Sequence, residues 1–318
     1  MNVPIAYTFS PILHTLASSI DRHRLHILTI PLLPRKEVAL RSQASEARIL
    51  TALKHAHIPM TATELSRILI TSPKRPHPME QEALLYRQAL SYIRNEWTGQ
   101  SIPLTRSHIE ILMHISLRHS FLRISRIMQA NSKDIQRLLT YLASSNDHPI
   151  LLAGITYAAI AHTNIHTFSQ GRITLLLTSL IMAKTGYDIR GMMPLESSLM
   201  RDPKAYNHAL SSITSYGQMT IWLEYFAQTI LLSYTDLILH VETAKKQADK
   251  TSPTNLLNDR QKHILILLDT YNTTITNREV QKRFHISQIT ASRDLTTLVS
   301  AGYLSSRGKG RSVSYELA

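Results

Sequence analysis

The sequence contains no cysteine and only nine glycines in 318 residues. Without cysteine, the chain can form neither a disulfide framework nor a thiolate metal site. It also has no run of 18 apolar residues, because the nearest candidate, Ile173 to Ala183, is too short and contains Thr and Ser. We therefore expect no membrane-spanning helix and no membrane partner. Met1 is not followed by a basic segment and an apolar segment of the export type, which favours a cytoplasmic protein.

Acidic residues are few as well. The 22 Asp and Glu stand against 35 Lys and Arg, which gives a formal net charge of +13. Such an excess of positive charge is typical of proteins with a polyanionic partner, either nucleic acid or an anionic membrane surface, and of these two we expect nucleic acid. Hydrophobic residues make up 43% of the chain, enough for ordinary globular cores. Few glycines and long Leu- and Ile-rich stretches at helical spacing predict a mainly α-helical protein.

Proline and polar clusters divide the chain into four predicted parts. An N-terminal helical region occupies residues 1–78 and ends in a stretch with three prolines, TSPKRPHP. A continuous set of helices follows over 79–244. The polar, charged segment 245–257 contains proline and is typical of a linker. Residues 258–318 then form a separate domain, in agreement with a chain length that favours two or three domains.

The C-terminal domain has the pattern of a winged helix-turn-helix. A first apolar helix follows the cap residue Asn258, and Thr276 caps a second helix, with Glu279 at the capping-box spacing. Ser287 caps a third helix, and two short strands are predicted at 303–304 and 312–315. The residues of the third helix that we expect to face inward are Ile289, Leu295, Leu298 and Val299.

This domain also carries features of a surface for double-stranded DNA. It holds nine Lys and Arg against five Asp and Glu. Small polar side chains on the third helix can approach base edges in the major groove, and cations on the hairpin can lie along a phosphate backbone. The predicted DNA-binding residues are Ser287, Gln288, Thr290, Ala291, Ser292, Arg293 and Thr296 on the helix and Arg307, Lys309 and Arg311 on the hairpin. Dimerisation or protein docking is the simpler use of such a domain, and the charged hairpin argues against it.

The middle of the chain carries motifs in a specific order. An apolar helix precedes the residues Ile-His-Thr-Phe at 165–168, and a second apolar helix follows Gly171-Arg172. The stretches LYRQAL at 85–90, YNHAL at 206–210 and WLEYF at 222–226 complete the set. This order resembles the Fic family, whose signature is His-Pro-Phe-x-(Asp/Glu)-Gly-Asn-Gly-Arg-x-x-Arg between two helices. The resemblance covers nearly the whole chain and implies a Fic-like all-α helical domain followed by a small winged helix-turn-helix (α+β) domain.

The signature itself is degenerate. Family members transfer AMP from ATP to a protein hydroxyl, using the histidine as general base, the acidic residue to hold magnesium and the glycine-rich turn to cradle the phosphates. The residues of this chain that match the signature are His166 as the catalytic remnant and Phe168, Gly171 and Arg172 as nucleotide-binding remnants. Only Ser169 and Gln170 lie between Phe168 and Gly171, two residues fewer than in the signature, and no carboxylate is present. We therefore expect a catalytically silent domain with no cofactor and no metal; a divergent AMP-transferase that uses His166 is the alternative.

Two further patterns leave alternatives open. The family's inhibitory helix carries Ser-x-x-x-Glu-Gly, and the N-terminal stretch 40–49 resembles it. Counted from Ser42 the glutamate is Glu46, whereas from Ser45 the position falls on Ile49; we favour the second register because Ala-Ser precedes the motif in many members. His162 and His166 lie four residues apart, which suits a metal pair on one helix face, but no third ligand accompanies them and local packing is the simpler interpretation.

Together these observations predict a DNA-binding transcriptional regulator built on a catalytically silent Fic-like scaffold. We expect a homodimer, because one small module offers limited base contact. A dimer would bind half-sites roughly 34 Å apart, or a multiple of that. The expected partners are double-stranded DNA, a second copy of the chain, and a nucleotide or small-molecule effector that could bind at the Gly171-Arg172 helix start.

Overall fold

The computed structural model describes residues 5–32, 34–71, 73, 75–250, 257–271, 274–308 and 313–317. The chain divides into two compact units. Unit 1 comprises Met1–Ile30 and Leu40–Glu242, and unit 2 comprises Pro31–Ala39 and Thr243–Ala318. The segment predicted to be a linker begins inside a helix, because α13 (Thr220–Lys250) continues as far as Lys250.

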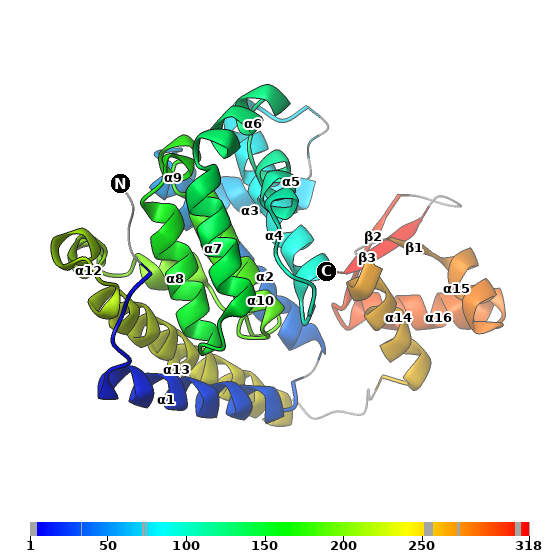
Figure 1. Cartoon of the computed structure of the whole chain (residues 1–318). Coiled ribbons are helices and arrows are strands. Elements are labelled where there is room, and N and C mark those ends of the chain that lie inside the picture. The colour runs from blue at the N-terminus through cyan, green and yellow to red at the C-terminus, as the bar shows by residue number, and fades with distance from the viewer. Residues whose placement is uncertain are drawn as a thin grey trace. The chain divides into compact units, whose positions relative to one another are not determined.

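Unit 1 is built from helices, which are shown in Figure 1; α2 begins, and α13 ends, with residues that belong to unit 2. Their bounds are α1 Pro11–Thr29, α2 Pro34–His55, α3 Ala62–Thr71, α4 Pro78–Trp97, α5 Arg106–Ser116, α6 Phe121–Ala130, α7 Ser132–Ser144, α8 Pro149–Ala161, α9 Asn164–Phe168, α10 Arg172–Lys184, α11 Leu195–Leu199 and α12 Pro203–Tyr216, followed by α13. Proline stands in the first turn of several of them, where its missing N–H leaves no hydrogen bond unmade.

Helix α10 lies at the centre of unit 1. Every residue from Arg172 to Ala183 is buried, and α8, α4 and α5 pack against it. The apolar runs that flank the Ile-His-Thr-Phe motif in the sequence thus form α8 and α10, both of which are largely buried. Helix α13 packs on α8 at Gly154, where an added Cβ would lie 2.8 Å from Leu223 Cδ2. The indole of Trp222 donates a hydrogen bond to the Gly154 carbonyl at 2.8 Å.

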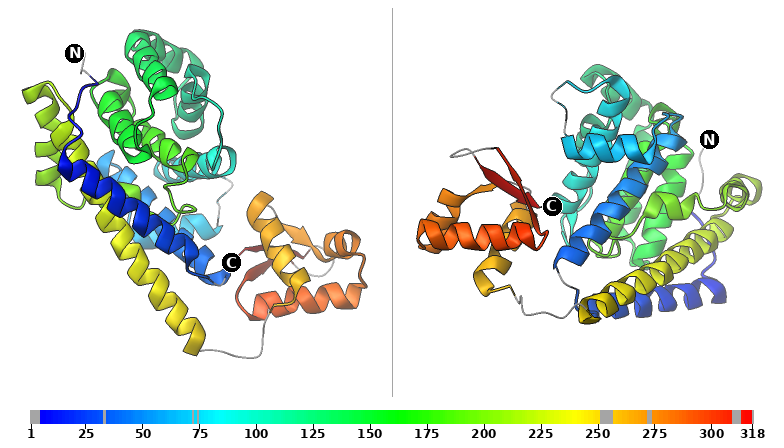
Figure 2. Two further views of the ribbon diagram at one scale, coloured as in Figure 1. Left: turned by 60° about the horizontal axis from the view of Figure 1, so that its bottom comes forward. Right: turned by 180° about the vertical axis from the view of Figure 1, so that it is seen from behind.

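Helices α1 and α13 lie side by side and run parallel along one side of unit 1, as both views of Figure 2 show. Ser10 at the start of α1 donates to Glu224 (2.6 Å), and His26 near its end contacts Glu242 (3.3 Å). The two pairs are separated by nearly the same number of residues along the chain, so together they define how α1 is aligned with α13. The N-terminal helix is therefore an integral part of unit 1.

Unit 2 contains α14 Asp259–Tyr271, β1 Ile275–Thr276, α15 Asn277–Phe284, α16 Gln288–Ser300, β2 Leu304–Arg307 and β3 Ser314–Leu317. The strands form an antiparallel sheet in the order β1-β3-β2, with Ile275 opposite Tyr315 and Leu304 opposite Leu317. The helices follow the predicted order, while the strand β1 between the first two is an addition. The core of the unit includes Ile264, Leu268, Val280, Leu295 and Leu298.

Candidate functional site

Helices α15 and α16 form a helix-turn-helix with capped termini. The Thr276 hydroxyl accepts the Glu279 N–H (3.3 Å), while the Glu279 carboxylate accepts the Thr276 N–H (2.7 Å), so the predicted capping box is formed. His285 ends α15 in the left-handed region at φ 51°. Ser287 then caps α16 by accepting the Thr290 N–H at 3.2 Å. The turn between the two helices is therefore short and defined at both ends.

One face of α16 is open to solvent. Its side chains line a shallow depression formed by Gln288, Ile289, Ser292, Arg293, Thr296 and Thr297. Four residues predicted to bind DNA belong to this set and are exposed, namely Gln288, Ser292, Arg293 and Thr296. Ser287 is exposed at the cap, and Thr290 is half-buried, with its hydroxyl 2.9 Å from that of Ser287. The structure thus brings most of the predicted helix residues to one face.

Two residues of α16 differ from their predicted orientation. Ala291 was assigned to the DNA-binding face but is fully buried in the core of unit 2, and Ile289 was assigned to the core but is 73% exposed. The inward stripe runs through Ala291, Leu295 and Leu298, at spacings of four and three residues. Ile289 precedes Ala291 by two residues, which turns it by roughly 200° around the helix axis. Ala291 is therefore a packing residue and leaves the DNA-binding set.

A buried carboxylate fixes α16 against the start of α14. Asp294 is 3% exposed and accepts hydrogen bonds from Arg260 (2.5 Å), Gln261 (3.0 Å) and Asn258 (3.3 Å). Burial alone would raise the pKa of Asp294, but these donors lower it below its usual value. The sequence indicated Asn258 as a cap but gave no signal that Asp294 is its partner, because the two lie 36 residues apart.

The hairpin between β2 and β3 is described only in part. Arg307 is exposed and forms an ion pair with Glu316 across the two strands, at 2.7 Å. Lys309 and Arg311, the other two hairpin residues predicted to bind DNA, lie outside the described residues. The charge of Arg307 is therefore partly balanced within the sheet.

The histidine of the degenerate signature lies on α9 and is turned toward α10. His166 Nδ1 is 2.9 Å from the Thr174 hydroxyl, and the His55 ring lies 6.2 Å away, centroid to centroid. Burial, with smaller contributions from His55 and His162, lowers the pKa of His166 to about 4. Its imidazole is therefore neutral at pH 7. His162, the other histidine of the pair weighed as a metal site, has its Nδ1 bonded to the Ala158 carbonyl at 2.8 Å.

The start of α10 is closed by neighbouring groups. The Arg172 N–H donates to the Ser169 carbonyl (3.1 Å), and the Ile173 N–H donates to the Ser169 hydroxyl (3.3 Å). Gly171 is in the left-handed region at φ 77°, and an added Cβ would lie 2.6 Å from His55 Cδ2. The His55 ring, from the end of α2, thus stands against the helix N-terminus. Sequence reasoning did not assign His55 to this place.

Arg172 and Phe168, the other remnants, have partners inside unit 1. Arg172 is 5% exposed, donates from Nε to the Ser169 carbonyl, and forms an ion pair with Glu82 of α4. Phe168 lies 4.5 Å from the His119 ring, centroid to centroid, and the Arg123 guanidinium carbon lies 5.3 Å from the centroid of the Phe168 ring. The loop is therefore packed and internally bonded.

A second buried cluster joins side chains of α2, α4, α10 and α11. Arg48 of α2 donates to Glu196 of α11 at 2.6 Å and also to the Ser179 hydroxyl of α10. The hydroxyl of Tyr86 donates to the same glutamate at 2.8 Å. Burial is the main cause that raises the pKa of Tyr86. No sequence signal identified this cluster, because its members come from four separate segments.

The segment compared with an inhibitory helix lies within α2. Ile49, which takes the place of the inhibitory glutamate when the motif is counted from Ser45, is fully buried. Glu46, which is the corresponding glutamate when the motif is counted from Ser42, accepts a hydrogen bond from Ser66 of α3 at 3.2 Å. His55, at the end of the same helix, lies against Gly171 of the signature loop.

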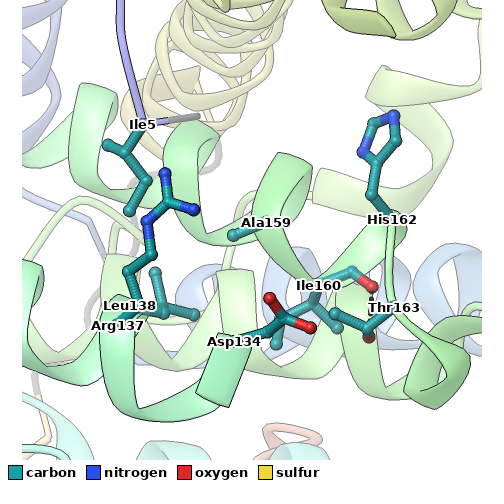
Figure 3. A pocket seen from close by; sticks show the side chains of 8 residues that line it. All are labelled: Ile5, Asp134, Arg137, Leu138, Ala159, Ile160, His162 and Thr163. Atoms are coloured by element: carbon teal, nitrogen blue, oxygen red, sulfur yellow. Dashed lines mark hydrogen bonds between the residues drawn. The ribbon is translucent and has the colours of Figure 1, made fainter. Parts of the chain in front are cut away.

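Two cavities formed by described residues of unit 1 are small. Figure 3 shows one beside α7 and α8, where Asp134 and Arg137 lie among apolar side chains. Its volume is about 20 Å³, which is room for little more than a water molecule. Over the described part of the chain, no group of three or more His, Asp or Glu side chains is placed to hold a metal ion. Among those same residues, no helix combines the length and apolar character needed to cross a bilayer.

Comparison with known proteins shows the fold. No protein-family model and no curated protein sequence matches the chain. A Fic family protein from Desulfovibrio desulfuricans G20 has a similar structure, with a TM-score of 0.63 and 13% identity over 99% of this chain and 98% of that one. Fic-1 from C. elegans gives 0.56 and 14% over 72% of both chains, and a Fic domain containing signaling protein from Bacteroides thetaiotaomicron VPI-5482 gives 0.50 and 16% over 74% of this chain and 97% of that one. The predicted Fic-like, mainly α-helical fold is confirmed.

Proposed function

For a chain with the Fic fold, we propose a role as a DNA-binding transcriptional regulator in which the helical unit is a catalytically silent scaffold. The C-terminal unit is a winged helix-turn-helix that binds duplex DNA, and the protein acts as a homodimer. The observation that carries the proposal is the exposed polar face of α16, which follows a short, doubly capped turn. A helix presented in this way can enter a major groove.

Charge on unit 2 supports a nucleic-acid partner. Arg293 lies on the exposed face of α16, and α15 adds exposed Arg278, Lys282 and Arg283. The Glu279 carboxylate accepts hydrogen bonds from Thr276 at the helix cap. Positive side chains that flank a polar helix face are the arrangement that positions a protein on phosphates while the helix contacts bases.

The remnant loop supports the silent role of the helical unit. A magnesium-bound triphosphate requires a carboxylate ligand and free donors at the helix N-terminus. The chain has no carboxylate between Phe168 and Arg172, and the first N–H groups of α10 already bond to Ser169. Arg172 is buried and paired with Glu82. The residues of this loop therefore do not fit a magnesium-bound triphosphate.

The protonation state of His166 points the same way. A general base works best when its pKa lies near the working pH. With a pKa of about 4, His166 would be a weak base at pH 7. Its Nδ1 is also occupied by the Thr174 hydroxyl.

Selection of bound sequences from random duplexes with the purified full-length chain tests the proposal. We expect enrichment of one motif, and binding that weakens as salt concentration rises. An Arg293→Glu variant should lose the enriched motif, whereas Arg126→Glu, at an exposed arginine of α6, should keep it. Failure to bind any duplex at low ionic strength would overturn the DNA-binding role.

A second experiment tests the silent role of the helical unit. The full-length chain is incubated with labelled ATP, magnesium and a cell lysate, and the His166→Ala variant is treated in parallel. We expect no label on any protein in either reaction. Label that appears with the wild type and disappears with His166→Ala would show a working AMP-transferase.

A further inference from the structure

We propose that Ile289 contacts the methyl group of a thymine in the major groove, so that each half-site contains a thymine that this protein requires. The inference rests on the proposed DNA-binding function and adds a base preference to it. Ile289 is the most exposed large apolar side chain among the described residues, at 73%. It stands in the first turn of α16, the part of such a helix that lies closest to base edges.

The surroundings of Ile289 are polar. It shares the open face of α16 with Gln288, Ser292 and Arg293. The core of unit 2 cannot accommodate it, because Ala291 and Leu295 already occupy the inward stripe. A single apolar side chain on a polar helix face matches a partner that offers one small apolar group among polar ones.

The major groove offers such a group. Base edges there present hydrogen-bond donors and acceptors, and the C5-methyl of thymine is the apolar feature. A β-branched side chain on a helix has one strongly preferred rotamer, so Ile289 loses little conformational freedom when it meets a methyl group. Gln288 and Arg293 beside it can bond to the neighbouring base edges.

The position of the thymine follows from helix spacing. Ile289 and Arg293 are four residues apart on one face of α16, which separates their Cβ atoms by roughly 6 Å. Base pairs are stacked about 3.4 Å apart. The thymine therefore lies within about two base pairs of the base that Arg293 contacts.

A protein partner explains this surface less well. Protein-docking patches are contiguous and extend over several hundred Å² of apolar surface. Ile289 is a single apolar side chain among polar ones. Unit 1, by contrast, has two adjacent exposed apolar side chains, Phe121 and Leu122, each 69% exposed.

The test replaces thymine by deoxyuridine, which removes the methyl group and leaves every hydrogen-bonding group in place. A duplex carrying the selected motif is prepared with each thymine replaced in turn, and affinity for the full-length protein is measured by fluorescence anisotropy. We expect one thymine per half-site at which the replacement weakens wild-type binding by about three- to tenfold. In Ile289→Ala, the thymine and deoxyuridine duplexes should bind equally.

Ile266→Ala is the matched control, because Ile266 is another exposed isoleucine of unit 2 (58%) and lies on α14. It should keep the wild-type discrimination, and circular dichroism should show that both variants fold. If Ile289→Ala still distinguishes the two duplexes as the wild type does, the inference is wrong while DNA binding stands. If Ile289→Ala changes only the oligomeric state, the side chain is a protein contact, and the inference is likewise wrong. If no duplex binds to the wild type, the proposed function itself fails.

Discussion

Arg293 occupies the middle of the open face of α16 and has no acidic residue of that face beside it. We predict that Arg293→Ala weakens binding to the selected duplex by about 1–3 kcal/mol, the loss expected for an arginine that contacts a base edge. Arg126→Ala, at an exposed arginine of α6, should change affinity little. Anisotropy titrations at one fixed salt concentration measure both. Equal effects of the two variants would mean that Arg293 contributes only nonspecific electrostatic attraction to DNA and contacts no base.

His166 gives a prediction about pH. Its pKa is lowered to about 4 in the folded protein, so the unfolded chain takes up a proton more readily. Stability from this residue is complete above the ordinary histidine pKa near 6.5 and is lost as pH falls toward 4. Between pH 7 and pH 5 we expect a loss of up to about 2 kcal/mol from His166.

Urea unfolding at pH 7 and pH 5 measures this loss, with His166→Gln as the comparison. Glutamine does not titrate and can keep a hydrogen bond to Thr174. The difference in unfolding free energy between the two pH values should therefore be smaller in the variant. An identical difference in both proteins would show that His166 is not held neutral by its surroundings.

Single residues also show where sequence reasoning stops. The caps at Thr276 and Ser287 were predicted because they depend on residues three apart. The orientations of Ile289 and Ala291 were not, because an isoleucine early in a helix was assumed to be buried. Only the actual packing of Ala291 with Leu295 and Leu298 determines which stripe faces inward.

At the scale of elements, the junction of α14 and α16 depends on Asp294. Removing a buried carboxylate leaves the Arg260 guanidinium and two amide donors without their acceptor. We predict that Asp294→Ala lowers the unfolding free energy of unit 2 by about 2–4 kcal/mol. Asp236→Ala, which removes an exposed partner of Arg201, should cost less than about 1 kcal/mol.

Thermal or urea unfolding followed by circular dichroism compares these two variants with the wild type. The loss in Asp294→Ala should appear in the transition that belongs to unit 2. A loss no larger than that of Asp236→Ala would contradict the role of Asp294 as a tie between the two helices.

The hairpin supplies a prediction about salt. If Lys309 and Arg311 contact phosphates, each change to alanine should weaken binding evenly across DNA sequences. The slope of log affinity against log salt should also fall by about 1 for each lost contact. Titrations at several salt concentrations, with Arg126→Ala again as control, measure the slope. An unchanged slope in both hairpin variants would mean that the hairpin does not lie along the backbone.

Element types were largely predictable, whereas their contacts were not. The apolar runs around the Ile-His-Thr-Phe motif predicted α8 and α10, because long apolar runs at helical spacing can be recognised from the local sequence alone. The strand β1 was missed because it has two residues, too few for any periodicity. The end of α13 was also missed, since a polar charged sequence is compatible with both a helix and a linker.

At the scale of the whole molecule, the proposed homodimer has a consequence for the proposed DNA site. Two copies related by a two-fold axis should select an inverted repeat, with half-site centres roughly 34 Å apart or a multiple of that. Sedimentation of the full-length chain with and without the selected duplex measures the stoichiometry, and footprinting measures the spacing. One chain bound to a single non-repeated half-site would contradict the dimer.

The order of motifs along the chain predicted the fold, since four separate stretches matched one family in sequence order. The closed state of the signature loop could not be predicted in the same way. The residues that close it, His55 and Glu82, belong to other helices, and nothing in their local sequence marks them. The loss of two loop residues was visible in the sequence, but the groups that fill the space were not.

The ring of His55 against Gly171 limits how this protein can change in evolution. Restoring the missing acidic residue alone would place a carboxylate beside a helix start whose amide groups are engaged and whose entrance is covered. A loop that could hold phosphates here would need more residues, a smaller side chain at position 55 and release of Arg172 from Glu82. On the proposed function, the helical unit therefore acts through its packing and its surfaces, and this loop stays a closed structural element.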